Sequence, residues 1–290
     1  MEYLALAQFF TSARGVDVFW SPLAITVIGG LIVTLILKKD GSQNTSNRGG
    51  LSLSDIRTLI EAELAKHRYA NQPVARQQTP RPKRRNGEDE GVVGGCFIAL
   101  IFLSVFYARN QAAVLDYSVM AATSLFGFWF AGIVFSIISG TLSGRGWAIY
   151  ATSVLVLTIS ALPMLYLGMT PLFAPTGIEN LQQVSVTLGL AGFIKSYGAE
   201  GVAFLFSQVL GFLVLYGAWL VVLLSLVFLS ASSFVATGVS GRKLWIWLSA
   251  KTAKFGNPIK ATAIVLSLYA ISFVMISGIA YEWWRSASSL

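Results

Sequence analysis

The chain has 290 residues, of which 55% are hydrophobic and only 12% are charged, and its mean hydropathy is +0.67. Soluble domains carry about 25% charged residues, so this composition excludes an ordinary water-soluble enzyme or binding domain. A net charge of +8 would suggest nucleic-acid binding in a soluble protein, but several apolar runs here exceed the roughly 18 residues that mark a membrane-spanning helix. The sequence predicts an all-α polytopic membrane protein.

Six apolar runs are long enough to cross a bilayer as helices. They cover residues 18–37, 92–108, 114–139, 147–169, 202–230 and 261–281. The first run is followed by Lys38 and Lys39, whereas a signal peptide carries its positive charge before the apolar segment. Residues 1–40 are therefore interpreted as an N-terminal segment with a retained first anchor.

The distribution of cations predicts the orientation, because short cytoplasmic loops accumulate Lys and Arg. With the N-terminus outside, seventeen of the 21 cations face the cytoplasm. The four that remain outside are Arg14, Arg109, Lys195 and Arg285. This asymmetry predicts six spans with both termini outside the cytoplasm (N-out, C-out).

Residues 41–91 form the cytoplasmic segment between the first two spans. Ser52 and Asp55 have the spacing of a capping box and precede an apolar stripe at helical spacing, which predicts an amphipathic helix over residues 53–69. The stripe consists of Leu53, Ile56, Ile60 and Leu64. A helix of this length does not make a domain alone, so the stripe is interpreted as a surface for homo-oligomerisation. Docking on the membrane surface or on the bundle are the alternatives.

Prolines and alternating charge runs predict a disordered linker over residues 71–91. Its cations belong to a larger basic set on the predicted cytoplasmic side. The simplest role of this set is to orient the chain, and the alternative is to bind lipid headgroups, a nucleotide, a nucleic acid or a cytoplasmic protein. The candidate residues for binding an anionic ligand or lipid are Arg81, Lys83, Arg84, Arg85, Arg145, Arg242, Lys243, Lys251 and Lys254.

Residues 92–290 are predicted to form a five-helix membrane bundle with an extracytoplasmic loop at 171–200 and a basic cytoplasmic loop at 231–260. The outer loop is apolar enough to lie on the membrane as an amphipathic helix or to re-enter the bilayer. In the inner loop, residues 243–255 can form an interfacial helix with Leu244, Leu248 and Phe255 on one side and lysines beside them.

Polar residues inside the predicted spans are few. Asp116 is the only ionisable one, which argues against a transporter built on buried carboxylates. Gln208 is the only side-chain amide well inside a span, where it forms an interhelical hydrogen bond or lines a polar path. Ser207, Gly211 and Gly127 are small enough to allow close helix packing. These five residues are the candidates for a pore lining or for helix packing.

The sequence contains no phosphate-binding loop, zinc-protease motif or nucleophile elbow, and it has one cysteine and one histidine. The expectation is a protein that is not an enzyme and needs no cofactor or metal. The preferred function is an oligomeric pore or channel-like effector of a bacterial antiviral defence system, embedded in the inner membrane. The alternative is a non-conducting anchor or assembly subunit of a secretion, conjugation or signalling complex, and a facilitator for a small neutral solute is also compatible.

Overall fold

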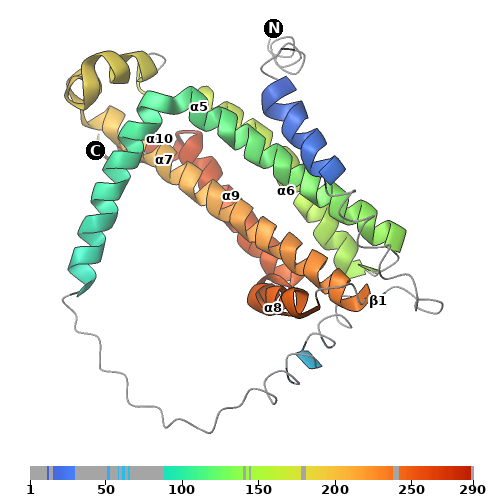
Figure 1. Ribbon diagram of the computed structural model, residues 1–290. Coiled ribbons are helices and arrows are strands. Elements are labelled where there is room, and N and C mark those ends of the chain that lie inside the picture. Colours follow the sequence, from blue (N-terminus) through green and yellow to red (C-terminus); the bar gives the residue numbers. More distant parts are fainter. Residues whose placement is uncertain are drawn as a thin grey trace. The chain divides into compact units, whose positions relative to one another are not determined.

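The structure, a computed structural model, describes residues 12, 16–29, 51–52, 58, 61–62, 65, 88–139, 142–143, 145–177, 181–237 and 242–288. This part of the chain is helical except for its connecting turns and two dipeptide strands, β1 (Leu51–Ser52) and β2 (Leu142–Ser143), which pair in parallel (Figure 1). The first helical stretch begins as a π-helical turn, η1 (Val16–Trp20), and continues to Gly29. The remaining helices are α5 (Glu88–Ser139), α6 (Arg145–Met169), α7 (Leu181–Thr237), α8 (Arg242–Thr252), the 3-10 turn η3 (Ala253–Phe255), α9 (Pro258–Ile276) and α10 (Ile279–Ser288).

Four of these helices are long and apolar enough to cross a membrane, which agrees with the predicted class of protein. The candidate spans are Ile98–Val134, Ala151–Met169, Lys195–Val235 and Ile259–Ile276, and Asp17–Gly29 is a shorter apolar helix. Their large exposed side chains are mostly apolar, as expected for helices that face lipid. The most apolar part of α7 is 44% buried, compared with 22–29% for the other three, so α7 is the helix with the largest buried share.

Helix α5 consists of two helices that meet at a kink at Asn110, whose φ of −122° and ψ of 27° are not helical. The Asn110 side-chain amide donates a hydrogen bond to the Phe106 carbonyl at 3.0 Å. Asparagine is a weak helix former because its side chain competes for backbone groups in this way. The kink lies between the predicted spans 92–108 and 114–139, where the sequence predicted a short connection.

Helix α7 has 57 residues and would be about 85 Å long if straight, far more than the hydrocarbon thickness of a bilayer. Gly198 interrupts it with a φ of +62°, a conformation that glycine adopts without a steric penalty. Part of the predicted outer loop 171–200 is therefore helical, beginning at Leu181, and the candidate span begins only at Lys195.

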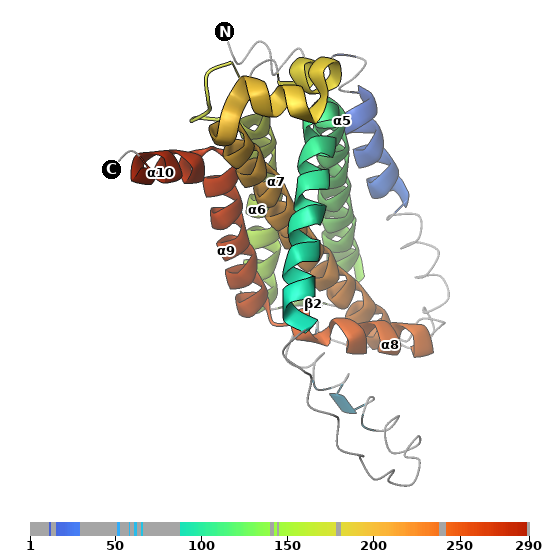
Figure 2. The same ribbon diagram turned by 90° about the vertical axis from the view of Figure 1, so that its left-hand side faces the viewer.

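The last predicted span, 261–281, is wrong at its end. Helix α9 stops at Ile276, the chain turns at Ser277 and Gly278, and α10 leaves in a new direction (Figure 2). Gly278 has a φ of +85°, which ends the helix. Tyr281 of α10 is buried, whereas Trp283 and Trp284 are 65% and 45% exposed, so α10 is a short amphipathic helix and not a continuation of the span.

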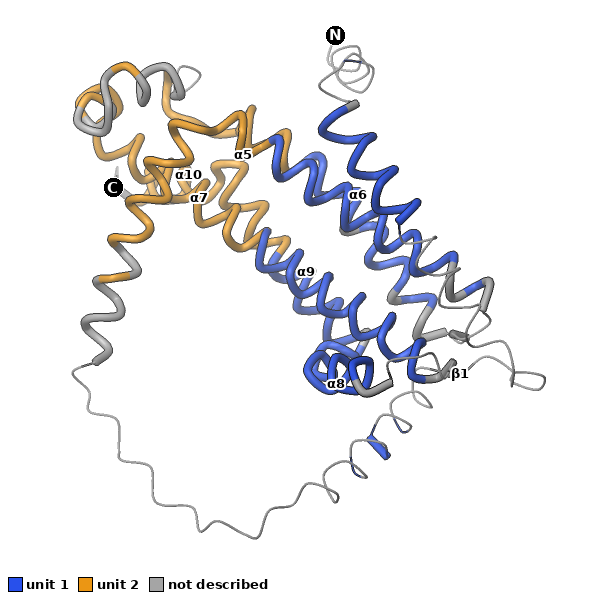
Figure 3. Tube along the Cα trace, in the orientation of Figure 1, with its two compact units in different colours: residues 1–71, 116–163, 216–268 blue, residues 72–115, 164–215, 269–290 orange. Residues whose placement is uncertain are grey.

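The described chain divides into two units, coloured separately in Figure 3. Unit 1 comprises residues 1–71, 116–163 and 216–268, and unit 2 comprises residues 72–115, 164–215 and 269–290. Helices α5, α6, α7 and α9 each contribute residues to both units. The polar cluster described below lies in unit 2, and helix α8 lies in unit 1.

Candidate functional site

A cluster of hydrogen-bonded polar side chains lies in the apolar core of unit 2. It consists of Tyr107 and Gln111 of α5 and Gln208 of α7, and we call it the polar cluster. The Tyr107 hydroxyl donates to Gln208 Oε1 at 3.4 Å, and Gln111 Nε2 donates to the Tyr107 hydroxyl oxygen at 3.4 Å and to the Gly168 carbonyl of α6 at 3.2 Å. Gln208 and Tyr107 are only 1% and 4% exposed and Gln111 is half-buried, so the cluster joins three helices from the core to its edge.

Helical spacing brings the Gln208 side chain into the core. Buried positions along α7 recur at alternating intervals of four and three residues, the spacing of a core-facing helix stripe. They are Phe204, Gln208, Gly211, Leu215, Ala218 and Val222. Gln208 therefore occupies a position that the pattern reserves for an apolar side chain, and an amide there needs a partner from another helix.

The two α5 members lie four residues apart, so they share one side of the helix even though the kink at Asn110 separates them. The Tyr107 ring contacts the Phe212 ring, with centroids 5.4 Å apart. At Gly168 an added Cβ would lie 2.6 Å from Cζ of Phe212, so glycine allows the end of α6 to approach that ring and expose its carbonyl to Gln111.

The hydrogen bonds of the polar cluster are long. Typical N–H···O distances are about 2.9–3.0 Å and O–H···O distances about 2.7–2.8 Å, so bonds of 3.2–3.4 Å are weaker than average. All three side chains are uncharged, and each can bond to water equally well. The arrangement can hold three helices together and can also exchange its internal bonds for water at a small enthalpic cost.

Ser207 and Gly211, the predicted small residues, lie where α7 approaches the end of α9. The Ser207 hydroxyl donates to the Met275 carbonyl at 3.2 Å, and the Ser272 hydroxyl donates to the Gly211 carbonyl at 2.9 Å. An added Cβ at Gly211 would lie 2.7 Å from Cγ1 of Ile276. Within unit 2 these residues thus serve close helix packing.

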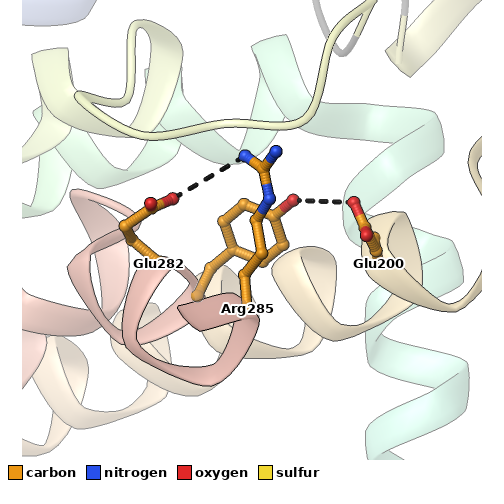
Figure 4. A network of polar contacts seen from close by, with 4 residues as sticks. Glu200, Glu282 and Arg285 are labelled. Carbon is orange, nitrogen blue, oxygen red and sulfur yellow. Dashed lines mark hydrogen bonds and ion pairs between the residues drawn. The ribbon is translucent and has the colours of Figure 1, made fainter. Parts of the chain in front are cut away.

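A second polar contact of unit 2 joins α7 to α10. The Tyr281 hydroxyl donates to Glu200 Oε2 at 3.1 Å, and beside it Arg285 pairs with Glu282 at 3.9 Å (Figure 4). The Tyr281 ring packs edge-on against Phe204 at 5.6 Å. Burial raises the pKa of Tyr281, and the hydrogen bond to the Glu200 carboxylate and its negative charge raise it further. Sequence reasoning missed Glu200, which lies two residues before the predicted start of its span.

The raised pKa of Tyr281 predicts a loss of stability in alkali. An unfolded tyrosine titrates near pH 10. Protonated Tyr281 therefore makes its full contribution to the free energy of unfolding below that pH, and the contribution is lost as the pH rises through the higher pKa of the folded state. We expect the melting temperature in detergent to fall above about pH 10, and to fall less steeply for Tyr281→Phe. Tyr117→Phe, which removes an exposed tyrosine, is the control. An equal slope for Tyr281→Phe and the unaltered chain would contradict the expectation.

The other predicted site residues are dispersed. Gly127 lies against the side chain of Thr26 in unit 1, where an added Cβ would collide with it, and Asp116 is half-buried on α5. Lys251 and Lys254 are exposed on and just after α8, while the backbones of Arg145, Arg242 and Lys243 belong to the first turns of α6 and α8. Outside the described residues lie Arg81, Lys83, Arg84, Arg85, Leu53, Ile56, Ile60 and Leu64.

Among the described residues, no group of three or more His, Cys, Asp or Glu side chains could hold a metal ion. Comparison of the chain with protein families, with curated proteins and with solved structures finds no match.

Proposed function

We propose that copies of this chain assemble into a channel-like pore in a bacterial inner membrane, as an effector of antiviral defence that is regulated through its basic cytoplasmic segments. The proposal includes six crossings with both termini outside. The two crossings beyond the four long apolar helices come from the short helix that ends at Gly29 and from the separate passage of the two parts of α5 on either side of Asn110.

The polar cluster is the observation that carries the proposal. A pore for ions or small solutes needs neutral polar groups that can replace hydration without binding too tightly. Tyr107, Gln111 and Gln208 are such groups, and the long hydrogen bonds among them and to Gly168 join three helices. Separation of those helices would replace each bond with a bond to water, so the same residues that close the bundle would line a wetted path.

The alternative function is a non-conducting membrane subunit that anchors or assembles a larger complex. One observation favours it: the hydroxyl of Tyr107 and the side-chain amide of Gln111 already have partners within the same chain. A bundle that satisfies its polar groups internally has no need of water in its core. The two functions make opposite predictions for a purified and reconstituted protein.

Conductance of the full chain in liposomes distinguishes them. Vesicles with a potassium gradient and a potential-sensitive dye should depolarise when the purified protein is present, with a rate that rises more steeply than linearly with protein content because several copies form the pore. Planar-bilayer recording should show discrete current steps. An intact bilayer at every protein content, together with a stable partner protein in detergent extracts, would reject the pore and favour the anchor.

A further inference from the structure

One side of helix α8 packs against the rest of unit 1. Ile246, Ser249 and Thr252 on that side are at most 5% exposed. The Trp245 ring next to them packs against Phe234 of α7, with centroids 4.5 Å apart. Ile246, Ser249 and Thr252 follow at intervals of three, so they define one buried face of the helix.

The chain that follows α8 is also held against α7. The Ser225 hydroxyl donates to the Phe255 carbonyl at 3.2 Å. At Gly256 an added Cβ would lie 2.6 Å from Cζ of Phe228, so the backbone passes directly over that ring. Figures 1 and 2 show α8 crossing the end of α7 at a steep angle. These contacts fix the orientation of α8 within unit 1, and with it the direction of its opposite face.

The opposite face of α8 is open and has two chemical zones. Leu244 and Trp247 are 57% and 56% exposed, and Lys251 and Lys254 are exposed after them. Positions 244, 247, 251 and 254 follow at intervals of three and four, so they lie in one row along the helix. We call this row the outward face. The sequence prediction likewise placed Leu244 on the apolar side of an interfacial helix, but it did not identify Ile246 as the residue that packs on the protein.

The outward face lies next to the beginning of a candidate span. Helix α9 starts at Pro258, and its apolar stretch Ile259–Ile276 begins with Ile259, which is 73% exposed. Lys260 is also exposed there. Between Glu200 and Glu282 the sequence contains five cations and no acidic residue, so no carboxylate nearby in the chain neutralises the lysines.

We propose that the outward face of α8 binds the anionic phospholipids of the adjoining leaflet. Leu244 and Trp247 enter the boundary between headgroups and acyl chains, and Lys251 and Lys254 meet the phosphates. Tryptophan is enriched at this depth of the bilayer, and each lysine near an anionic surface adds about 1 kcal/mol of attraction. This inference is independent of whether the protein conducts.

Charge and apolar exposure select lipid over two other occupants. A second copy of α8 would bring the lysines of both copies together, which is unfavourable. A nucleic acid would match the lysines but would leave exposed Leu244 without an apolar partner. Only a bilayer surface offers phosphates beside hydrocarbon at the level where α9 becomes apolar.

A fluorescent label on α8 of the full chain tests the proposal. In the background Cys96→Ser, Leu244→Cys receives an environment-sensitive dye, and the protein is reconstituted in phosphatidylcholine alone or in an equimolar mixture with phosphatidylglycerol. We expect lipids with a quencher near the headgroup to quench the dye about twofold more strongly in the mixed vesicles, and high salt to reduce the difference. Native mass spectrometry of the unlabelled protein should show retained phosphatidylglycerol.

Charge reversal provides the matched comparison. Lys251→Glu with Lys254→Glu should abolish the difference between the two kinds of vesicle, whereas Arg109→Glu with Lys195→Glu, an equal charge change at exposed residues elsewhere, should leave it unchanged. Equal quenching in both vesicles, or the same difference after reversal of Lys251 and Lys254, would overturn the proposal.

Discussion

Gly278→Ala is expected to lower the free energy of unfolding by at least about 2 kcal/mol, because it combines a backbone penalty with a steric clash. Gly278 has a φ of +85°, which residues with a Cβ adopt only at a cost. The added methyl group would also collide with the Phe173 carbonyl and lie 3.3 Å from the Phe204 ring.

The clash matters because residues 171–177 depend on the same turn. The Ser277 carbonyl accepts hydrogen bonds from the backbone N–H groups of Leu172 and Phe173, at 3.0 and 3.1 Å. Moving Phe173 away from a methyl group at position 278 would lengthen both bonds. The substitution should therefore loosen both the connection after α6 and the start of α10.

Two other glycines separate the backbone effect from the clash. Gly198 also has a positive φ, but an added Cβ would have no atom within 4 Å, and Gly217 has neither a positive φ nor a close neighbour. Melting temperatures in one detergent should therefore decrease in the order Gly217→Ala, Gly198→Ala, Gly278→Ala. Gly217→Ala should be neutral or slightly stabilising, because alanine is favoured over glycine within a helix. A Gly278→Ala protein as stable as Gly217→Ala would contradict the geometry of this turn.

The apolar runs predicted the helices well because length and hydropathy determine them, but they predicted helix ends less well. The kink of α5 at Asn110 was readable from the polar run Arg109-Asn110-Gln111. The turn at Gly278 was not, because apolar residues continue on both sides of it. Only the left-handed backbone of one glycine separates α9 from α10.

The faces of the helices were harder to predict than the helices themselves. On α8 the sequence grouped Leu244 with Leu248 and Phe255 as the apolar side, but it did not identify the side that packs on the protein, which Ile246 and Ser249 form. In a soluble protein an exposed leucine on a regular stripe would be costly. Lipid is as apolar as a leucine side chain, so hydrophobicity does not distinguish the side that faces protein from the side that faces the bilayer.

The polar cluster was predicted in part for a related reason. Gln208 stood out because it is an isolated amide in an apolar run, which requires no knowledge of its neighbours. Tyr107 and Gln111 have the four-residue spacing that would have placed them on one side of a helix. Their contact with Gln208 depends on which helices pack together, and helical periodicity within one segment contains no information about that pairing.

Substitutions in the polar cluster are expected to separate stability from conduction. Gln208→Leu removes the hydrogen bond between the Tyr107 hydroxyl and Gln208 Oε1 from one side, and Tyr107→Phe removes it from the other. Each should lower the free energy of unfolding by about 1 kcal/mol, the typical net contribution of one hydrogen bond. The double variant removes both partners of that hydrogen bond, and Gln111 keeps its bond to the Gly168 carbonyl, so the variant should be nearly as stable as the unaltered chain.

The double variant is then the decisive test of the pore. Phenylalanine and leucine keep the volume of the core but offer water no hydrogen bond, so a path that passes the cluster would stay dry when the helices separate. We expect conductance to fall about tenfold or more, equivalent to about 1.4 kcal/mol in the energy of a conducting state, while the melting temperature is unchanged. Ser232→Ala, which removes a buried hydroxyl elsewhere on α7, should leave conductance intact. Full conductance in the stable double variant would show that ions do not pass the cluster, and the cluster would then have only a role in holding α5, α6 and α7 together.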